Sequence, residues 1–333
     1  MIPKQASPDI YFSAAYGKAA AHAEKTSSWH LISYDDDQWQ LPLLVRELSS
    51  GYRDAISPYG YCGIYCSPEV SDPHTLWRQT RDHLDRLGVV SIFIRDSPLV
   101  PTFRPPEALA IVDDHPTFYL RRMNEEAAWR SMEGRARTAV RKAIKSGVSA
   151  TLRKVSEPDL EPGSPFRTLY ESTMQRVGAN QEYIFGDAYY RTLFSGLKED
   201  LYIAVAERER EVLAASLFMV GQAGMHYHLS GSTREASRLG ASNLLLWEAW
   251  RFASSLRLPG LHLGGGVRKG DSLEKFKRSF GGDQTIYSAY GVVIDRGQYE
   301  TETSRAAAAL GCSDSDLLST GFFPAYRAQP STD

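Results

Sequence analysis

The segment from residue 201 to residue 231 restricts the possible folds most. Apolar and polar residues alternate there in three runs separated by short turns, which predicts a meander of three antiparallel strands. The runs are 201–206, 212–220 and 225–231. Helical spacing predicts the flanking helices, and apolar runs predict two more strands. These elements are the helices 166–177, 187–197 and 242–256 and the strands 261–263 and 286–294. The second half is therefore predicted to be an α+β unit, with helices against a mixed sheet.

The first half shows a looser version of the same order. Its predicted elements are a helix at 9–22, a hairpin of 30–34 and 39–48, a helix at 76–87, a strand at 89–94 and short strands at 108–112 and 117–120. Two such units indicate an internal duplication, and 333 residues suit two domains of about 150 residues each. We expect one domain at 1–147, a second at 148–297, and a C-terminal segment, 298–333, that packs back on the first.

Composition narrows the class of protein. No apolar run approaches the roughly 20 residues of a membrane-spanning helix, and residues 1–6 lack the charged-then-apolar pattern of a signal peptide. We therefore expect a cytoplasmic protein without membrane insertion. Its three cysteines, Cys62, Cys66 and Cys312, leave one unpaired in any disulfide scheme, which suits a reducing compartment. Because no second Cys/His pair at zinc-like spacing accompanies Cys62 and Cys66, no metal is expected.

Basic residues are concentrated between positions 130 and 154. The net charge of −2 argues against a protein that coats nucleic acid nonspecifically, but it leaves room for a local basic patch. A helix is predicted from the cap at Asn124 to Gly147. Arg137, Arg141 and Lys145 recur every four residues along it. Two interpretations stay open, a solvated helix face and a surface that meets phosphate groups.

Residues 260–282 concentrate the chemistry. A short apolar strand runs into three consecutive glycines, where a ligand can approach the backbone because no Cβ intervenes. A cationic helix follows, in which Lys277 shares a face with Leu273 and Phe280. By spacing alone, the commoner interpretation is a lysine that extends its ammonium group to water from the rim of a core.

Several short motifs are spread along the chain. They include Ser-Pro-Tyr-Gly-Tyr at 57–61, Tyr-x-x-Thr-Met at 170–174, Asn-Leu-Leu-Leu-Trp-Glu at 243–248, Leu-Gly-Gly-Gly at 263–266 and Asp-Ser-Leu-Glu-Lys-Phe-Lys-Arg-Ser-Phe-Gly at 271–281. Together these motifs resemble those of the Fem family, aminoacyl-tRNA-dependent transferases of the GNAT superfamily. The resemblance implies an α+β fold of two tandem GNAT-like acyltransferase domains. The long helical hairpin of some bridge-forming members is absent from the sequence pattern.

The resemblance also assigns roles to residues. It implies that Phe276 and Lys277 lie at the transfer site, with the lysine stabilising the negative charge that develops on the ester carbonyl oxygen. The positions that it implies for substrate binding are Tyr59, Tyr61, Tyr183, Tyr227, Asn243 and Gly265. Arg137, Arg141 and Lys145 become candidates for tRNA binding. His226 and His228 fit core or cleft positions better than the role of a catalytic base.

Departures from the family pattern bear on the substrates. The segment 237–242 fits poorly the glycine-rich loop that holds the pyrophosphate of acetyl-CoA in many GNAT enzymes. We therefore expect aminoacyl-tRNA as co-substrate and no bound cofactor. Family members that act on cell-wall precursors can carry an arginine in the loop after the Thr-Met helix, where this chain has Asn180-Gln181-Glu182-Tyr183. That departure and the missing helical hairpin favour a small peptide or nucleoside-type amine as acceptor, as in the antibiotic-biosynthesis branch. The alternatives are a peptidoglycan bridge-forming aminoacyltransferase and an acyl-CoA-dependent N-acyltransferase.

Overall fold

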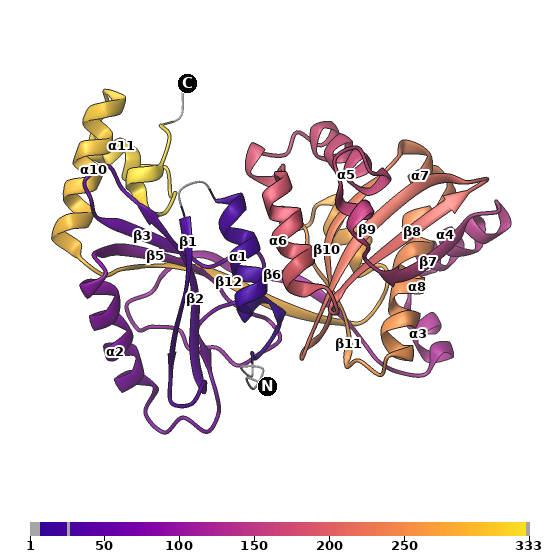
Figure 1. Cartoon of the computed structure of the whole chain (residues 1–333), viewed down its shortest axis with the longest axis horizontal. Coiled ribbons are helices and arrows are strands. Elements are labelled where there is room, and N and C mark those ends of the chain that lie inside the picture. Colours follow the sequence, from indigo (N-terminus) through magenta and orange to yellow (C-terminus); the bar gives the residue numbers. More distant parts are fainter. Residues whose placement is uncertain (1–6, 25–26, 331–333) are drawn as a thin grey trace. The chain divides into compact units, whose positions relative to one another are not determined.

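The computed structural model describes residues 7–24 and 27–330, so the segment 1–6 that bears on a signal peptide lies outside the described residues. Internal contacts divide the chain into two compact units (Figure 1). Unit 1 contains Tyr11–Asp114 and the described part of Tyr287–Asp333, and unit 2 contains Pro8–Ile10 and His115–Ile286. This division differs from the expected boundary at 147/148. The reason is that residues 134–145 form a helix that packs on helix α8 (Ala241–Ser255) of unit 2.

Unit 1 is a mixed sheet with helices. In chain order its elements are the 3-10 turn η1 (Ile10–Phe12, in this unit from Tyr11), α1 (Ala14–Ala23), β1 (Ser27–Tyr34), β2 (Trp39–Glu47), β3 (Arg53–Ile56), β4 (Tyr65–Cys66), α2 (Pro73–Arg86), β5 (Val89–Arg95), β12 (Asp283–Val293, in this unit from Tyr287), α10 (Arg296–Leu310), α11 (Asp314–Ser319) and the 3-10 turn η4 (Ala325–Arg327). The strand order is β1-β2-β3-β5-β12. The predicted hairpin is confirmed, since β1 and β2 pair antiparallel from Tyr34↔Trp39 onward. Helix α10 begins at Arg296, where Asp295 caps it by accepting from the Gln298 N–H.

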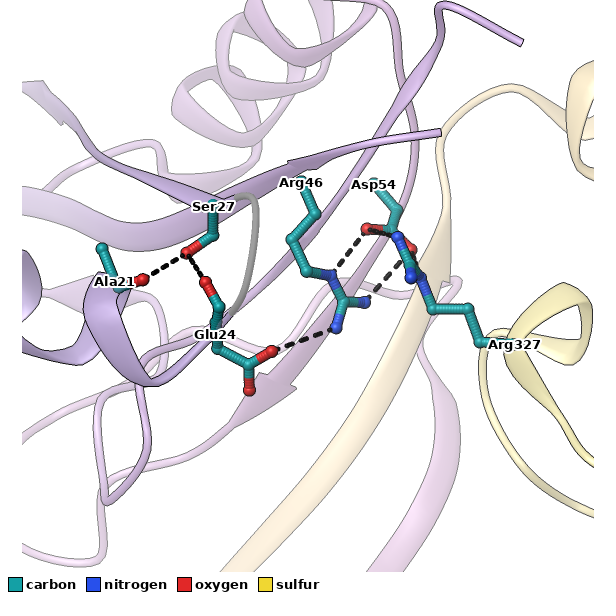
Figure 2. Close-up of polar contacts among 6 residues, drawn as sticks. All are labelled: Ala21, Glu24, Ser27, Arg46, Asp54 and Arg327. Carbon is teal, nitrogen blue, oxygen red and sulfur yellow. Dashed lines mark hydrogen bonds and ion pairs between the residues drawn. The ribbon is translucent and has the colours of Figure 1, made fainter. Parts of the chain in front are cut away.

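A buried carboxylate ties the C-terminal segment to this sheet. Asp54 on β3 is 1% exposed and accepts hydrogen bonds from two guanidinium groups (Figure 2). Arg46 on β2 donates through Nε at 2.8 Å and Nη2 at 3.1 Å, and Arg327 of η4 donates through Nη2 at 3.0 Å. Arg46 also reaches Glu24 at 3.6 Å. The contacts fix residues 325–327 against β3, and the described part of 298–333 accordingly falls in unit 1.

Unit 2 holds the predicted meander. Its elements are β6 (Leu109–Arg121, in this unit from His115), α3 (Glu125–Ser131), α4 (Gly134–Lys145), β7 (Ser149–Lys154), η2 (Glu157–Leu160), α5 (Pro165–Arg176), η3 (Gln181–Tyr183), α6 (Asp187–Leu197), β8 (Leu201–Arg208), β9 (Glu211–Gly221), β10 (Gly224–Ser232), α7 (Arg234–Leu239), α8, β11 (Gly260–Gly265) and α9 (Ser272–Arg278). The strand order is β6-β11-β10-β9-β8-β7. Antiparallel pairing of β8, β9 and β10 confirms the meander.

Two local expectations are corrected in the stretch before the meander, and one strand is added. The helix expected from Asn124 to Gly147 is two helices, because Met132 and Glu133 adopt extended backbone between α3 and α4. The residues after Gly147 form an additional edge strand, β7. The two short strands expected at 108–112 and 117–120 are one strand, β6.

The described helices are short. The longest, α8 and α10, have 15 residues each, and no helix in the described ranges combines the length and apolarity needed to cross a bilayer.

Candidate active site

The strands β10 and β11 of unit 2 part after a short paired stretch. They run parallel, and the register joins Met225 to Leu261 and His226 to His262. Just beyond these pairs each strand carries an irregularity, β10 between Tyr227 and Leu229 against β9, and β11 between His262 and Gly264 against β6. A bulge bends a strand and increases its twist, so bulges at matched positions open a gap between the two strands.

Helix α9 places Lys277 at this gap. Asp271 caps the helix by accepting from the Glu274 N–H at 2.7 Å, and it also holds the N–H groups of Val267 and Arg268. The Lys277 side chain is buried, with 7% exposed. Its Nζ donates to the carbonyl oxygen of Gly265 on β11 at 2.7 Å and lies 5.6 Å from the ring centre of Tyr227 on β10. One ammonium group thus contacts both strands where they diverge.

The surroundings of Lys277 disfavour its charge. Burial lowers the pKa of Lys277 to about 7, and the Asp271 carboxylate acts weakly in the opposite direction. Among the described residues no carboxylate forms an ion pair with it; a carbonyl oxygen and an aromatic face take that place. Near neutral pH this group is therefore available both as an ammonium and as an amine. Its side chain does not extend to water, so the interpretation drawn from spacing alone is wrong.

The glycine run is required by close packing. Gly264 has a positive φ of 68°, a conformation that favours glycine. A Cβ on Gly265 would lie 2.5 Å from the Pro116 carbonyl oxygen, and a Cβ on Gly266 would lie 2.4 Å from Asp271 Oδ1. The glycines therefore allow β11 to approach β6 and the cap of α9, which brings the Gly265 carbonyl to Lys277.

Two other residues expected at the site, Phe276 and Tyr227, lie beside Lys277. Phe276 is half-buried and packs edge-on against Phe280, 5.4 Å between ring centres. Tyr227 is half-buried, and burial raises the pKa of its hydroxyl, which bonds to Ser230 and Ser216. Lys277 thus meets both Gly265 and Tyr227, with Phe276 beside it on α9.

The remaining four substrate-binding candidates are distributed over both units. Tyr59 and Tyr61 belong to unit 1, where the Tyr59 carbonyl accepts from Tyr16 and the Tyr61 ring packs edge-on against Tyr287 at 5.3 Å. In unit 2, Tyr183 lies in η3, where its carbonyl accepts from Tyr170 at 2.7 Å. Asn243 lies in the first turn of α8.

Half of the eight cations in the basic stretch are paired with nearby carboxylates. Four of its cations form ion pairs, namely Arg130 with Glu126, Arg135 with Glu133, Arg153 with Asp159 and Lys154 with Glu199. Arg137 donates to the carbonyl oxygens of Arg130 and Met132, at the C-terminal end of α3, and so serves the fold. Arg141 is exposed and stacks 5.2 Å from the Trp129 ring centre, and Lys145 is exposed.

A buried polar group next to the gap had no signal in the sequence. Asp9 and His226, each 1% exposed, lie 2.8 Å apart between Oδ2 and Nε2. His262 on β11 is also 1% exposed. The alternation of β10 indicated that His226 is a core or cleft residue, but nothing near Asp9 in the chain points to the strand that it meets.

Comparisons with known proteins relate this chain to acyltransferases. Residues 131–278 match the family described as the acetyltransferase (GNAT) domain, which supports acyl transfer as the class of reaction. No curated protein sequence matches the chain. Among solved structures, FemX is similar with a TM-score of 0.64 and 13% identity, covering 88% of this chain and 94% of FemX.

Two further structures are similar over comparable lengths. A conserved protein of unknown function from Bacteroides thetaiotaomicron has a TM-score of 0.54 and 12% identity, over 84% of this chain and 90% of its own. The C-terminal domain of a protein called a lysylphosphatidylglycerol synthetase, from Agrobacterium fabrum, has a TM-score of 0.52 and 11% identity, over 86% and 92%. The fold is therefore a GNAT-like mixed α/β fold with helices flanking the sheet.

Proposed function

We propose that this chain is an aminoacyltransferase that moves an amino acid from aminoacyl-tRNA to the amine of a small peptide or nucleoside-type acceptor. The observation that carries the proposal is the buried Lys277 in the gap between β10 and β11, held by the Gly265 carbonyl and the Tyr227 ring. The match of residues 131–278 to a GNAT domain and the likeness to FemX support it.

The proposed reaction needs one well-placed positive hydrogen-bond donor. The acceptor nitrogen attacks the ester carbonyl carbon, the C–N bond forms, the C–O bond to the terminal ribose breaks, and the nitrogen loses a proton that the ribose oxygen gains. Negative charge develops on the carbonyl oxygen during the attack. A donor such as Lys277 in a site shielded from water stabilises that charge by about 3 to 4 kcal/mol. Phe276 would shape the same site from the same helix.

The proposed contacts with tRNA use only those basic residues that the fold leaves exposed. Arg141 and Lys145 remain candidates for tRNA phosphates, whereas Arg137 is committed to the end of α3. Tyr59, Tyr61, Tyr183, Tyr227 and Asn243 remain candidates for contacts with the acceptor or the aminoacyl group. The proposal uses no cofactor and no metal, with aminoacyl-tRNA as co-substrate and the cytoplasm as the compartment.

An acyl-CoA-dependent N-acyltransferase is the second candidate, favoured by the match to an acetyltransferase domain. In such enzymes a helix N-terminus holds the pyrophosphate. Here α8 begins at Ala241 after Gly240, whose φ is 80°, and a Cβ on Gly240 would lie 2.3 Å from the Ala139 carbonyl oxygen of α4. This close packing on α4, together with the sequence departure at 237–242, favours tRNA as carrier. A peptidoglycan precursor is the alternative acceptor.

The test supplies each carrier separately. The protein is incubated with aminoacyl-tRNA charged with a radiolabelled amino acid and with dipeptide or aminonucleoside acceptors. We expect labelled amide that disappears when ribonuclease is added first and that falls strongly in Lys277→Ala. Product formation that ribonuclease leaves unchanged, or tight CoA binding by calorimetry with acetyl-CoA turnover, would instead establish the second candidate.

A further inference from the structure

The loop 266–270 joins β11 to α9 at the open end of the gap that holds Lys277, and it belongs to unit 2. The parallel strands β10 and β11 are paired at two positions near their N-terminal ends, so the gap opens toward their C-terminal ends. The loop leaves β11 directly after Gly265, whose carbonyl oxygen accepts the bond from Lys277. Side chains of this loop therefore border the place where the proposed reaction occurs.

Two carboxylates hold the backbone of this loop from the inside. Asp271 Oδ2 accepts from the N–H groups of Val267 at 2.7 Å and Arg268 at 2.9 Å. Glu274, which is 1% exposed, accepts from the Gly270 N–H at 2.6 Å. Because the Asp271 carboxylate also caps α9, the loop offers side chains to a ligand rather than a free helix N-terminus. The backbone of the loop is thus fixed before any ligand binds, which lowers the entropy lost on binding.

The side chains of the same loop extend into solvent. Val267 is 81% exposed, and Arg268 and Lys269 are exposed as well. In the part of the chain that the structure describes, neither of these two cations forms a hydrogen bond or an ion pair through its side chain. Arg278 of α9, by contrast, is paired with Glu274. Two unpaired cations on a fixed loop at the mouth of a gap attract an anionic ligand.

The spacing along the chain limits how far these cations lie from the reacting ester. Arg268 follows Gly265 by three residues, so their Cα atoms are at most about 11 Å apart. In an aminoacyl-tRNA the ester joins the 2′ or 3′ oxygen of the terminal ribose, and the nearest phosphate is on the 5′ carbon of that same ribose. In an acyl-CoA a pantetheine arm separates the thioester from the pyrophosphate. A phosphate close to the reacting carbonyl is therefore a property of the tRNA ester.

Building on the proposed function, we propose that Arg268 and Lys269 bind the phosphates of the terminal nucleotides of aminoacyl-tRNA and so position its ester at Lys277. These two cations form the phosphate site. They are positioning residues, because they contact the phosphates and not the atoms that react. The exposed Val267 beside them presents an apolar side chain to the adjoining sugar and base.

Helix α4 begins beside α9, so the phosphate site is close to a second basic surface. Arg135, in the first turn of α4, donates to the carbonyl oxygen of Lys275 on α9 at 2.8 Å. A nucleic acid bound at the phosphate site can extend from there along α4, which carries Arg141 and Lys145. Lys275 is two positions from Lys277 and therefore lies on the opposite side of α9, away from the gap, so it is not part of the phosphate site.

Binding of RNA in the absence of any transfer tests the phosphate site. The probe is a fluorescent RNA hairpin that ends in an unpaired 3′-ACCA and carries no amino acid, titrated at several salt concentrations. We expect the double variant Arg268→Gln, Lys269→Gln to bind the hairpin about tenfold more weakly, and the slope of log affinity against log salt to fall by about 1.4, as for two contacts with a single strand. Unchanged affinity and slope would overturn the proposal. A double variant that loses CoA binding and keeps RNA binding would assign the cations to CoA and overturn it as well.

The matched control removes two cations from the other end of the same sheet. Lys198 precedes β8 and Arg257 precedes β11, both are exposed, and neither side chain is paired within the described residues. Since β8 and β11 run in the same direction, both positions lie at the end of the sheet opposite to the loop 266–270. The variant Lys198→Gln, Arg257→Gln should bind the hairpin as wild type does. An equal loss in both double variants would mean that overall charge attracts the RNA, and the phosphate site would be rejected.

A transfer assay with two small donors separates the phosphate site from the proposed function. One donor is an amino acid ester of the 3′ oxygen of adenosine, and the other is the same ester of adenosine 5′-phosphate, each supplied with the dipeptide or aminonucleoside acceptors. We expect the phosphate to raise kcat/KM about tenfold in wild type and to have no effect in the double variant at positions 268 and 269. Equal use of both donors by wild type would overturn the phosphate site and leave the proposed function standing. If neither donor nor aminoacyl-tRNA reacts, the proposed function fails, and the hairpin titration alone decides the phosphate site.

Discussion

Two buried charges in this chain are treated in opposite ways. Asp54 of unit 1 is 1% exposed and receives bonds from two arginines, so its charge is matched on two sides (Figure 2). Lys277 of unit 2 is 7% exposed and is held by a carbonyl oxygen and an aromatic ring. The first arrangement stabilises an ion, and the second leaves a base whose proton is weakly held. A buried charge that is paired with opposite charges holds the fold together, whereas a buried lysine that forms no ion pair becomes a reactive group.

The largest expected effect is a loss of transfer rate, without a loss of stability, when Lys277 is replaced. Lys277→Met removes the donor and keeps the volume, so transfer should fall about 10²- to 10³-fold, or roughly 3 to 4 kcal/mol. The melting temperature should stay equal or rise, because an unpaired buried charge is gone. Transfer rates measure the first effect, and thermal unfolding measures the melting temperature. Lys275→Met, an exposed lysine on the same helix, is the control. Unchanged turnover in Lys277→Met would contradict the mechanism.

The second prediction concerns the matched charge. Asp54→Asn leaves Arg46 and Arg327 without their carboxylate, so the free energy of unfolding should drop by about 3 kcal/mol. Urea denaturation followed by circular dichroism measures it. Glu300→Gln, which breaks the exposed Arg296–Glu300 pair, should cost less than about 1 kcal/mol. An equal loss in both variants would show that burial does not distinguish these pairs.

The third prediction follows from the lowered pKa of Lys277. Between about pH 7 and pH 10 the unfolded chain keeps the proton on this lysine while the folded chain has released it. The unfolded state then binds more protons, so stability rises with pH, by up to about 1.4 kcal/mol per pH unit. The difference in unfolding free energy between wild type and Lys277→Met isolates this slope. A difference independent of pH would mean that Lys277 has an ordinary pKa.

The smallest expected effect concerns exposed basic residues and is a change in tRNA affinity. Replacing Arg141 and Lys145 with alanine should weaken tRNA binding several-fold and reduce the slope of log affinity against log salt by up to about 2. Filter binding at several salt concentrations measures this. The control is Arg153→Ala, because Arg153 is already paired with Asp159, and this variant should leave the slope nearly unchanged.

The periodicity of apolar residues predicted those elements whose signal lies within their own residues. The meander of β8 to β10 and the hairpin of β1 and β2 were predicted because period-two alternation and turn residues are local signals. The helix expected from Asn124 to Gly147 was wrong because extended backbone at Met132 and Glu133 interrupts it, and the only local sign of that break is Gly134, which begins α4. The domain boundary differed because contacts of α4 with α8 decide it.

The sequence by itself determined the order of elements, the glycine run and the placement of a lysine on a short capped helix. Those properties depend on residues within a few positions of one another. Only the tertiary structure decided that Lys277 is buried against Gly265 and Tyr227, that Arg137 serves the end of α3, and that Asp9 meets His226. Burial and charge pairing depend on residues distant in the chain, and these set the chemistry of an ionisable group.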